Sequence, residues 1–430
     1  MLQNQLGLQP LRDHNHAGCP TLAASSLLWL GWDECAPLKG RPIILPAMQV
    51  IRLTLVVCVS AVAAAQSPAP AQPPSPLTAR QIWQMQESGT SAGLRGIDSV
   101  DGTVAWASGT GGTVLRTIDG GAHWQKCATP DAAKDGATLD FRGVQAWDAQ
   151  TAIAMASGPG EKSRLYKTDD GCKTWKLIFA NPDEDGFFDA ILRTTEDRLY
   201  VLGDPVRRIF ALFQSEDRGE TWYAAGELGR DAQADEASFA ASNSELATYG
   251  PYLLFGSGGS AAHVFATVAK CSPPPGNPNG PATANCVVGF QSSEVPVAAG
   301  TPASGVFSLA SRRISAKNGL LTAIVVAVGG SYDHSDSAAR TAAFSTDGGL
   351  HWTASTTPPH GFRSAVQWSE ALKAWITVGT NGSDISRDDG KTWQPLDDGN
   401  WNALSLPFVV GPNGRIARLN AQSLTPAGGP

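Results

Sequence analysis

The chain has 430 residues and a formal net charge of −7 at pH 7, with 46 glycines, 29 prolines and only 17% charged residues. Many glycines and prolines together with few charges predict a soluble β protein that is rich in turns. The mildly acidic balance argues against general nucleic-acid binding, because that function needs a basic surface.

Residues 48–65 have the pattern of a secretory signal peptide. Arg52 follows Met48 and supplies the positive start, an apolar run comes next, and the small residues Ala63 and Ala65 stand where a signal peptidase would cut. The apolar run is too short to span a membrane comfortably. We therefore expect export to the periplasm or the cell exterior, without a membrane span in the mature chain.

The rest of the chain divides by composition. The first 47 residues show no usable periodicity, so we interpret residues 1–47 as an upstream mis-extension of the true start. Residues 66–76, QSPAPAQPPSP, form a linker rich in Pro, Ala and Ser that cannot bury a core. We assign residues 77–424 to the folded domain and residues 425–430 to a tail.

A short motif recurs through the folded domain. It consists of Ser or Thr, Asp two residues on, Gly two further and Trp three beyond that, as in SRDDGKTW from Ser386 to Trp393. Each copy stands between apolar runs and predicts a hairpin turn, in which Asp accepts backbone hydrogen bonds and Gly supplies a positive φ. One copy has Cys172 in place of this Gly. The Asp and Trp residues of the copies, interpreted as structural, are Asp119 and Trp124, Asp170 and Trp175, Asp217 and Trp222, Asp347 and Trp352, and Asp388 and Trp393.

This motif resembles the Asp-box, or BNR repeat, of sialidases and related β-propellers. The order of the boxes and the stretches LRGI, FFDA and GRIARL resemble the bacterial relatives of the photosystem II stability and assembly factor. The resemblance covers nearly all of residues 80–420 and implies a secreted propeller. It implies little about chemistry, because a fold does not fix a function.

The spacing of the boxes predicts seven blades. Box tryptophans recur at intervals of 41 to 51 residues, apart from one gap of 130, and a period of this size with four short strands is typical of propeller blades. Two further landmarks locate units within this gap. Each unit has an apolar residue where its first strand is expected to start and a glycine where its second strand is expected to end. We therefore expect an all-β fold, a seven-bladed β-propeller of four-stranded antiparallel blades. The apolar strand starts are Leu94, Phe141, Phe188, Phe239, Phe307, Phe362 and Trp401.

An N-terminal strand is expected to complete the last blade. After Gly411 the chain has only one more strand, residues 415–419, where a four-stranded blade needs two. The segment QIWQMQE, residues 81–87, places Trp83 where the box tryptophans stand relative to their fourth strands. Its pairing would close the ring and cover an exposed sheet edge.

The fourth unit has no Asp box. Its third strand runs into Cys271, followed by a loop rich in Pro, Gly and Asn and then by Cys286. Two cysteines across the base of a hairpin in an exported protein predict a disulfide, with two free thiols as the alternative. Whether Cys127 and Cys172 also form a bridge stays open.

Candidate binding residues follow the starts of the first strands. In propellers these positions ring one mouth of the central channel, on the face opposite the Asp boxes. Three arginines in an arc would recognise a carboxylate, sulfate or phosphate through their planar forks. The alternative is that they pair with Asp189, Asp204 or channel waters. The positions are occupied by Arg95, Arg142, Asp189, Ala240, Ser308, Arg363 and Asn402.

Loops after the second strands add Asp204, Tyr332 and Asp333 to the same face. A Tyr with carboxylates and three Arg resembles the sialidase site, in which Tyr is the nucleophile. However, no Arg-Ile-Pro segment precedes the first box, and seven blades rather than six would place the arginines differently. The run YDHSD is interpreted as a solvated loop rather than a metal site. We predict no metal and no cofactor, because neither ligand spacing nor a nucleotide-binding motif is present.

These observations favour an exported, non-catalytic and monomeric propeller. It would bind a protein partner, a small anion or a carbohydrate at the channel mouth, as an assembly or scaffold factor. A sialidase-like glycoside hydrolase is the alternative, and a purely structural module without a defined pocket is a third hypothesis.

The mature protein is expected to begin near Gln66, because the small residues of the cleavage site end at Ala65. Intact-mass spectrometry of the exported protein measures its first residue directly. An exported species that still contains residues 1–47 would contradict both the start site and the signal peptide.

Overall fold

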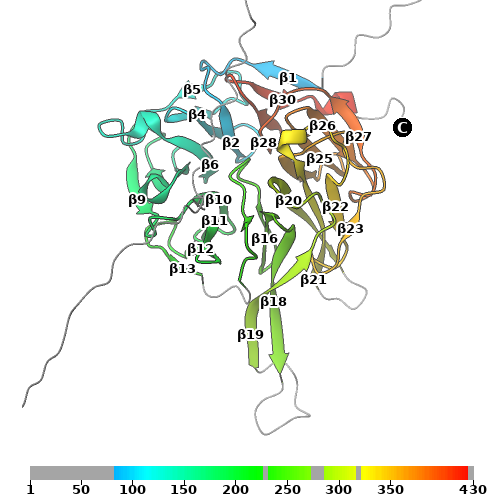
Figure 1. Ribbon diagram of the computed structural model, residues 1–430. Coiled ribbons are helices and arrows are strands. Elements are labelled where there is room, and N and C mark those ends of the chain that lie inside the picture. The colour runs from blue at the N-terminus through cyan, green and yellow to red at the C-terminus, as the bar shows by residue number, and fades with distance from the viewer. Residues whose placement is uncertain (1–81, 226–230, 273–284, 316–320, 425–430) are drawn as a thin grey trace, which may run out of the picture. The chain divides into compact units, whose positions relative to one another are not determined.

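Seven antiparallel blades surround a central channel in the computed structural model, which describes residues 82–225, 231–272, 285–315 and 321–424 (Figure 1). The predicted all-β, seven-bladed propeller is therefore confirmed. The assignments of the mis-extension, signal peptide, linker and tail fall on residues outside these ranges and stay predictions. Among the described residues, no helix is long and apolar enough to cross a membrane.

The blades use the chain in order, and each runs from the channel outward as in the sheet β2-β3-β4-β5. Blades one to three contain β2 (Leu94–Ser99), β3 (Ala105–Gly109), β4 (Thr113–Thr117), β5 (Gln125–Lys126), β6 (Asp140–Ala146), β7 (Ala152–Ser157), β8 (Arg164–Thr168), β9 (Lys176–Ala180), β10 (Phe188–Arg193), β11 (Leu199–Val206), β12 (Ile209–Ser215) and β13 (Tyr223–Ala224). Blade four contains β15 (Leu246–Tyr249), β16 (Tyr252–Gly256), β18 (His263–Ser272) and β19 (Asn285–Glu294).

Blades five to seven complete the ring. They contain β20 (Thr301–Ser315), β21 (Leu321–Ser331), β22 (Ala342–Ser345), β23 (Thr353–Ala354), β24 (Ala365–Ser369), β25 (Ala374–Gly379), β26 (Gly382–Ser386), β27 (Gln394–Asp397), β28 (Ala403–Ser405), β29 (Phe408–Val410), β30 (Ile416–Leu419) and β1 (Trp83–Gln86). Short 3-10 turns are η1 (Gly136–Thr138), η2 (Gly160–Lys162), η3 (Tyr332–His334) and η4 (Ala421–Leu424).

The hydrophobic core lies between the blades. Among the described residues, seven apolar clusters each join two neighbouring blades, and together they run once around the ring. Side chains alternate between the two faces of a strand, so a blade with apolar residues on both faces is covered only when it has two neighbours. The largest fully buried side chains in these clusters include Trp106, Trp375 and Trp401.

The N-terminal strand closes the ring, as predicted. β1 pairs antiparallel with β30, with Trp83 opposite Leu419. Trp83 is 3% exposed, and its indole N–H donates to the Ser383 hydroxyl at 3.1 Å in the neighbouring blade. The strand therefore completes the last sheet and also binds the blade before it.

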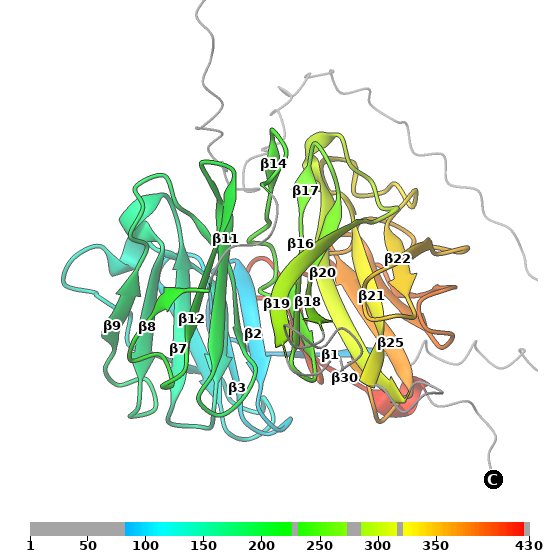
Figure 2. The same ribbon diagram turned by 90° about the horizontal axis from the view of Figure 1, so that it is seen from below.

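Blades four and five depart from the sequence prediction. The first strand of blade four begins at Leu246, so Phe239 does not open it. Two short strands, β14 (Glu236–Ala237) and β17 (Gly258–Gly259), instead extend the sheet of blade five to six strands on the side of the channel mouth (Figure 2). The missing Asp box in blade four is accompanied by a long hairpin, β18 and β19, that projects from the ring (Figure 1).

Each Asp box is held by hydrogen bonds within its own turn. In the last box, Ser386 donates its hydroxyl to Asp388 at 2.9 Å and accepts the Gly390 N–H at 3.0 Å. Asp388 also accepts the Thr392 N–H at 2.9 Å, and the Trp393 indole donates to the Gly390 carbonyl at 3.2 Å. In three boxes the hydrogen bonds to the carboxylate lower its pKa to about 2; these are Asp119, Asp170 and Asp217.

The Asp box that has Cys172 in place of glycine is bonded to the neighbouring blade. Cys172 has a φ of +64° and forms a disulfide with Cys127, which follows the outer strand of blade one. The Trp175 indole donates to the Ala128 carbonyl at 2.8 Å rather than to its own turn. A bridge that the sequence left open thus joins blades one and two at their outer edge.

The predicted Cys271–Cys286 bridge has support from the backbone alone. The register of β18 and β19 places Cys271 directly opposite Cys286. The side chains of these two residues lie outside the part of the structure that is described, so this bridge stays a prediction.

Replacing Cys127 with Ala should lower the free energy of unfolding by about 4 kcal/mol, the chain-entropy value for a closed loop of this length. The bridge spans 45 residues. Urea unfolding of the variant and of the parent measures the difference.

Non-reducing peptide mapping of the parent is the control, and it tests the Cys271–Cys286 bridge in the same sample. Parent and variant with equal unfolding midpoints, or a parent map with Cys127 as a free thiol, would contradict the prediction.

Candidate functional site

The two faces of the propeller are set by the direction of the first strands. In three boxes, an N–H of the Asp-box turn donates to a carbonyl of the turn between the first and second strands, all at 2.9 Å; the pairs are Gly120 to Thr103, Gly171 to Gln150 and Arg218 to Asp197. The Asp boxes therefore lie at the ends of the first strands. The starts of those strands form the opposite face, which we call the channel mouth.

Several candidate residues at the mouth stand on β-bulges. The strand register skips Arg95 in blade one, Arg142 in blade two and Asp189 in blade three. In blade five the skipped residue is Phe307, so Ser308 stands one position further along than the sequence alignment implied. A bulge changes the direction in which a side chain points. In blades one, two and three the bulged residue is the one that follows the apolar strand start.

Arg95 and Arg142 are brought together by Asp140. Arg142 Nε donates to Asp140 Oδ2 at 2.8 Å, and Arg95 Nε lies 3.4 Å from Asp140 Oδ1. Arg142 also donates to the Ala240 carbonyl at 3.3 Å. The sequence analysis named Asp189 and Asp204 as partners and missed Asp140, although it stands two residues before Arg142.

Arg363 is held inside blade six. Its side chain is fully buried and forms an ion pair with Asp384, with a shortest N–O distance of 2.5 Å. It also donates to the Asn381 amide oxygen at 2.5 Å, and its guanidinium lies 2.9 Å from His360 Nδ1. Arg363 thus has a carboxylate partner of its own, whereas Arg95 and Arg142 share one.

Asn402, Tyr332 and Asp333 have separate positions at the mouth. The Asn402 amide donates to the Leu94 carbonyl at 2.8 Å and so joins blade seven to blade one. Tyr332 packs edge-on against Phe307 at 6.1 Å, and burial raises its pKa. Asp333 is exposed and accepts the Ser331 hydroxyl at 2.5 Å, which lowers its pKa.

Residues 239–245, which we call the channel segment, cross the channel instead of forming a strand. Ser242 donates to the Ser364 carbonyl at 2.6 Å in blade six. Asn243 accepts the Ile191 N–H at 2.8 Å from blade three and donates to the Val144 carbonyl at 3.3 Å in blade two. The segment therefore contacts blades on opposite sides of the ring, which explains why Phe239 and Ala240 are not at a strand start.

Three carboxylates are buried where the channel segment meets the mouth. Burial and the nearby charges of Asp204 and Glu245 raise the pKa of Asp189 well above its usual value, although Arg142 opposes this. Burial also raises the pKa of Asp204 to about 6 and that of Glu245 strongly. Asp204 accepts the N–H of Ser238, just before the channel segment, at 3.0 Å. Glu245, the last residue of the segment, accepts the N–H of its first residue, Phe239, at 2.7 Å.

Glu245 was missed by the sequence analysis. It precedes β15 directly and is 1% exposed, and a single acidic residue before a strand carries no signal that it will be buried. Asp189 Oδ2 and Glu245 Oε1 accept no hydrogen bond from the described part of the chain. Such buried oxygens favour the protonated carboxyl, because an unpaired buried charge is costly.

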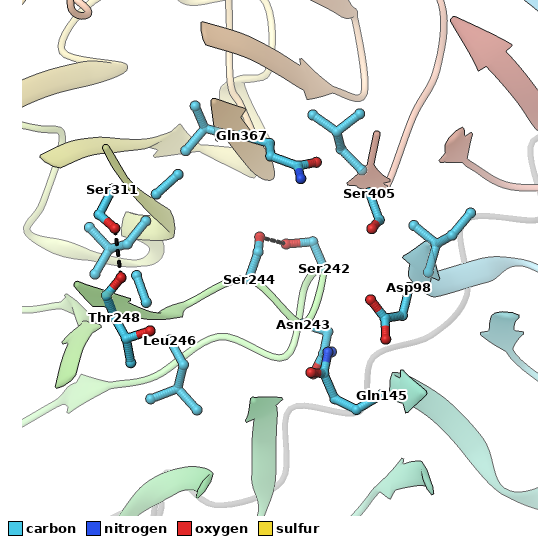
Figure 3. A pocket seen from close by; sticks show the side chains of 16 residues that line it. Asp98, Gln145, Ser242, Asn243, Ser244, Leu246, Thr248, Ser311, Gln367 and Ser405 are labelled. Carbon is cyan, nitrogen blue, oxygen red and sulfur yellow. Dashed lines mark hydrogen bonds between the residues drawn. The ribbon is translucent and has the colours of Figure 1, made fainter. Parts of the chain in front are cut away.

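A cavity lies on the side of the channel segment that faces away from the mouth. It has a volume of about 240 Å³ and is lined by the ends of the first strands and by the channel segment itself (Figure 3). Asp98, Gln145, Gln367 and Ser405 contribute its polar wall. None of these four residues was a candidate in the sequence analysis.

The geometry gives no three-arginine grip on one ligand. Two arginines meet on Asp140 and the third is buried on Asp384. Within the described ranges, no three His, Cys, Asp or Glu side chains are grouped so that they could hold a metal ion. At the mouth, Arg95 and Arg142 thus meet on Asp140, next to the buried acids Asp189, Asp204 and Glu245.

Comparison with known proteins gives structural neighbours only. No protein-family profile and no curated protein match the chain. YCF48 bound to D1 peptide is 17% identical, with 79% of this chain and 97% of that chain covered and a TM-score of 0.47. YCF48 from Cyanidioschyzon merolae is 16% identical, with 79% and 99% covered and a TM-score of 0.49.

Replacing Asp204 with Asn should flatten the dependence of stability on pH. A carboxyl with a raised folded pKa contributes stability that is full below its unfolded pKa, about 4, and is lost as the pH rises through the folded value of about 6. The parent should lose on the order of 2 kcal/mol from this group over that window. The variant should not lose it, because its amide keeps the acceptor for the Ser238 N–H without titrating.

Urea unfolding between pH 4 and pH 7.5 measures this slope. Asp336→Asn, which removes an exposed carboxylate, is the matched control. Identical slopes for the parent and Asp204→Asn would show that Asp204 ionises normally.

Proposed function

We propose that this protein is an exported, non-catalytic propeller that binds a protein partner at the channel mouth, as an assembly or scaffold factor. The observation that carries the proposal is the meeting of two guanidiniums from neighbouring blades on one carboxylate, Asp140. Guanidinium groups are planar forks that bind carboxylates and other anions, so their presence at the mouth favours a partner that brings such a group.

The arginines are placed for contact with such a partner. The Arg95 side chain is 20% exposed at the mouth, whereas the Arg142 side chain is only 10% exposed, so Arg95 is the more accessible of the two. Their positions are fixed by the bulges of β2 and β6, which reduces the ordering cost of binding. Burial raises the pKa of neighbouring Asp189 well above its usual value, which favours its neutral form.

Export is supported by the Cys127–Cys172 disulfide. Both cysteines are buried, at 6% and 1% exposure. Structural disulfides persist in oxidising compartments and are rare in the cytosol. We propose the periplasm or the cell exterior as the location, and a monomer as the working form.

Arg95→Ala should weaken binding of an anionic probe about tenfold or more, the scale of one charge-assisted hydrogen bond. The probes are sulfate, phosphate and an acidic peptide, Ac-Glu-Glu-Glu-NH₂, compared with its glutamine counterpart by calorimetry. Arg142 still holds Asp140 in this variant, so the fold should persist.

Arg198→Ala is the matched control, because Arg198 belongs to the opposite face and pairs with Glu216 at 2.7 Å. Equal binding of the Glu and Gln peptides, or equal loss in both variants, would contradict an anion-recognising mouth.

A glycoside hydrolase is the second candidate, and only Tyr332 favours it. Burial raises the pKa of this phenol, whereas a nucleophile needs a lowered one or a base beside it. Turnover of sialosides or aryl glycosides that disappears in Tyr332→Phe would replace the binding proposal with the catalytic one.

A further inference from the structure

The cavity beyond the channel segment is formed by parts of six blades. Its wall includes the ends of β2, β6, β24 and β28 and residues of β15 and β20, and Ser242 and Ser244 form its inner end. Figure 3 shows these two serines in the middle of the channel, with Asp98, Gln145, Gln367 and Ser405 around them. The cavity thus lies on the Asp-box side, away from the arginines.

Asp98 is the one charged side chain that lines this cavity. Its Oδ2 accepts the Ala146 N–H at 2.7 Å from the neighbouring blade. Within the described ranges, no lysine, arginine or histidine forms an ion pair with it. Arg193 is the nearby positive charge, and its guanidinium lies over the Trp147 ring at 5.5 Å instead.

Burial raises the pKa of Asp98 to about 6, and the Ala146 N–H and Arg193 only partly oppose this. The carboxylate is therefore ionised near neutral pH, but its charge is poorly compensated. A half-buried anion in this state is stabilised by any cation that reaches it.

The rest of the wall has two kinds of surface. Three polar side chains are fixed because each accepts a backbone N–H from the next blade at 2.7 to 2.9 Å. Gln145 accepts from Arg193, Gln367 accepts from Leu406, and Ser405 accepts from Ser99. Between them stand aliphatic side chains, namely Ile97, Leu246, Leu309, Val366 and Leu404. A carboxylate with oxygen acceptors and an aliphatic surround matches a cation on a hydrocarbon stem.

We propose that this cavity binds an alkylammonium group, with its charge at Asp98 and its methylenes against the aliphatic wall. Lysine side chains and free primary amines share this chemistry. An anion would meet an uncompensated carboxylate here, and a metal ion would find a single carboxylate where it needs several ligands. The site is separate from the channel mouth, so it does not depend on the function proposed above.

The test uses n-butylammonium and its neutral counterpart n-butanol, with calorimetry or NMR titration of the domain. A second pair, N-acetyl-lysine methylamide and N-acetyl-norleucine methylamide, distinguishes a peptide side chain from a free amine. Both cationic probes remain charged across the range used. The cation of at least one pair should bind, and its neutral counterpart should not.

Asp98→Asn should weaken the cation about tenfold or more, while the variant's amide oxygen can still accept the Ala146 N–H. The matched control is Asp101→Asn, which removes an exposed carboxylate from the turn that follows β2. In the parent, lowering the pH from 7.5 to 5 should weaken binding about tenfold, because Asp98 with a pKa of about 6 becomes protonated.

Binding of n-butylammonium alone would identify a free amine as the ligand, and binding of the lysine derivative alone would identify a side chain. Absence of binding by both cations would overturn the proposal. So would equal binding of cation and neutral probe, or an Asp98→Asn variant that keeps the affinity and pH profile of the parent.

Discussion

Every blade of this protein has two apolar faces, and only a closed ring covers both of them. The clusters that join neighbouring blades replace the single central core of most domains. The centre of the ring has polar groups together with a small apolar cluster of Phe239, Phe307 and Phe362. Side chains at the ends of the inner strands accept backbone N–H groups of the next blade, as Asp98, Gln145 and Gln367 do. Closure therefore fixes both the apolar packing and the polar lining of the channel.

The channel segment divides this polar centre into two ends of different character. The mouth has Arg95 and Arg142 on Asp140, with Asp189, Asp204 and Glu245 buried beside them. The other end has a single carboxylate among amides, hydroxyls and aliphatic side chains. Residues 239–245 form hydrogen bonds to blades two, three, five and six, so this one segment borders both ends.

The repeat period was readable from the sequence, because each Asp box is a local motif whose bonds stay within a few residues. The pairing of Trp83 with the last blade was also predictable, since a four-stranded blade with three strands needs a fourth. The side-chain contacts inside the channel could not be predicted from the sequence. Asp98 accepts an N–H from the neighbouring blade, and Asp140 links Arg142 of its own strand to Arg95 of the blade before it. Glu245 is buried without any local pattern that indicates it, and none indicates a partner in another blade.

The same limit explains the misplacement of Phe239 and why the pairing of Cys127 with Cys172 stayed open at the level of the sequence. A strand start and a channel-crossing loop both look like an apolar residue followed by small polar ones. The cysteines are far apart in sequence and are brought together only by the packing of blade two on blade one.

The strand that closes the ring, β1, is the first strand in the described part of the chain, and it pairs with the last one, β30. Trp83 donates to Ser383 across 300 residues, and Gln86 accepts the indole N–H of Trp124 in the first Asp box. The first box thus lacks its outer neighbour until the final strand exists. Contacts of such long range form late and slow the folding of a chain. Loss of β1 or of β30 should accordingly affect blades one and seven together, because the two strands pair and Gln86 of β1 also bonds Trp124 of blade one.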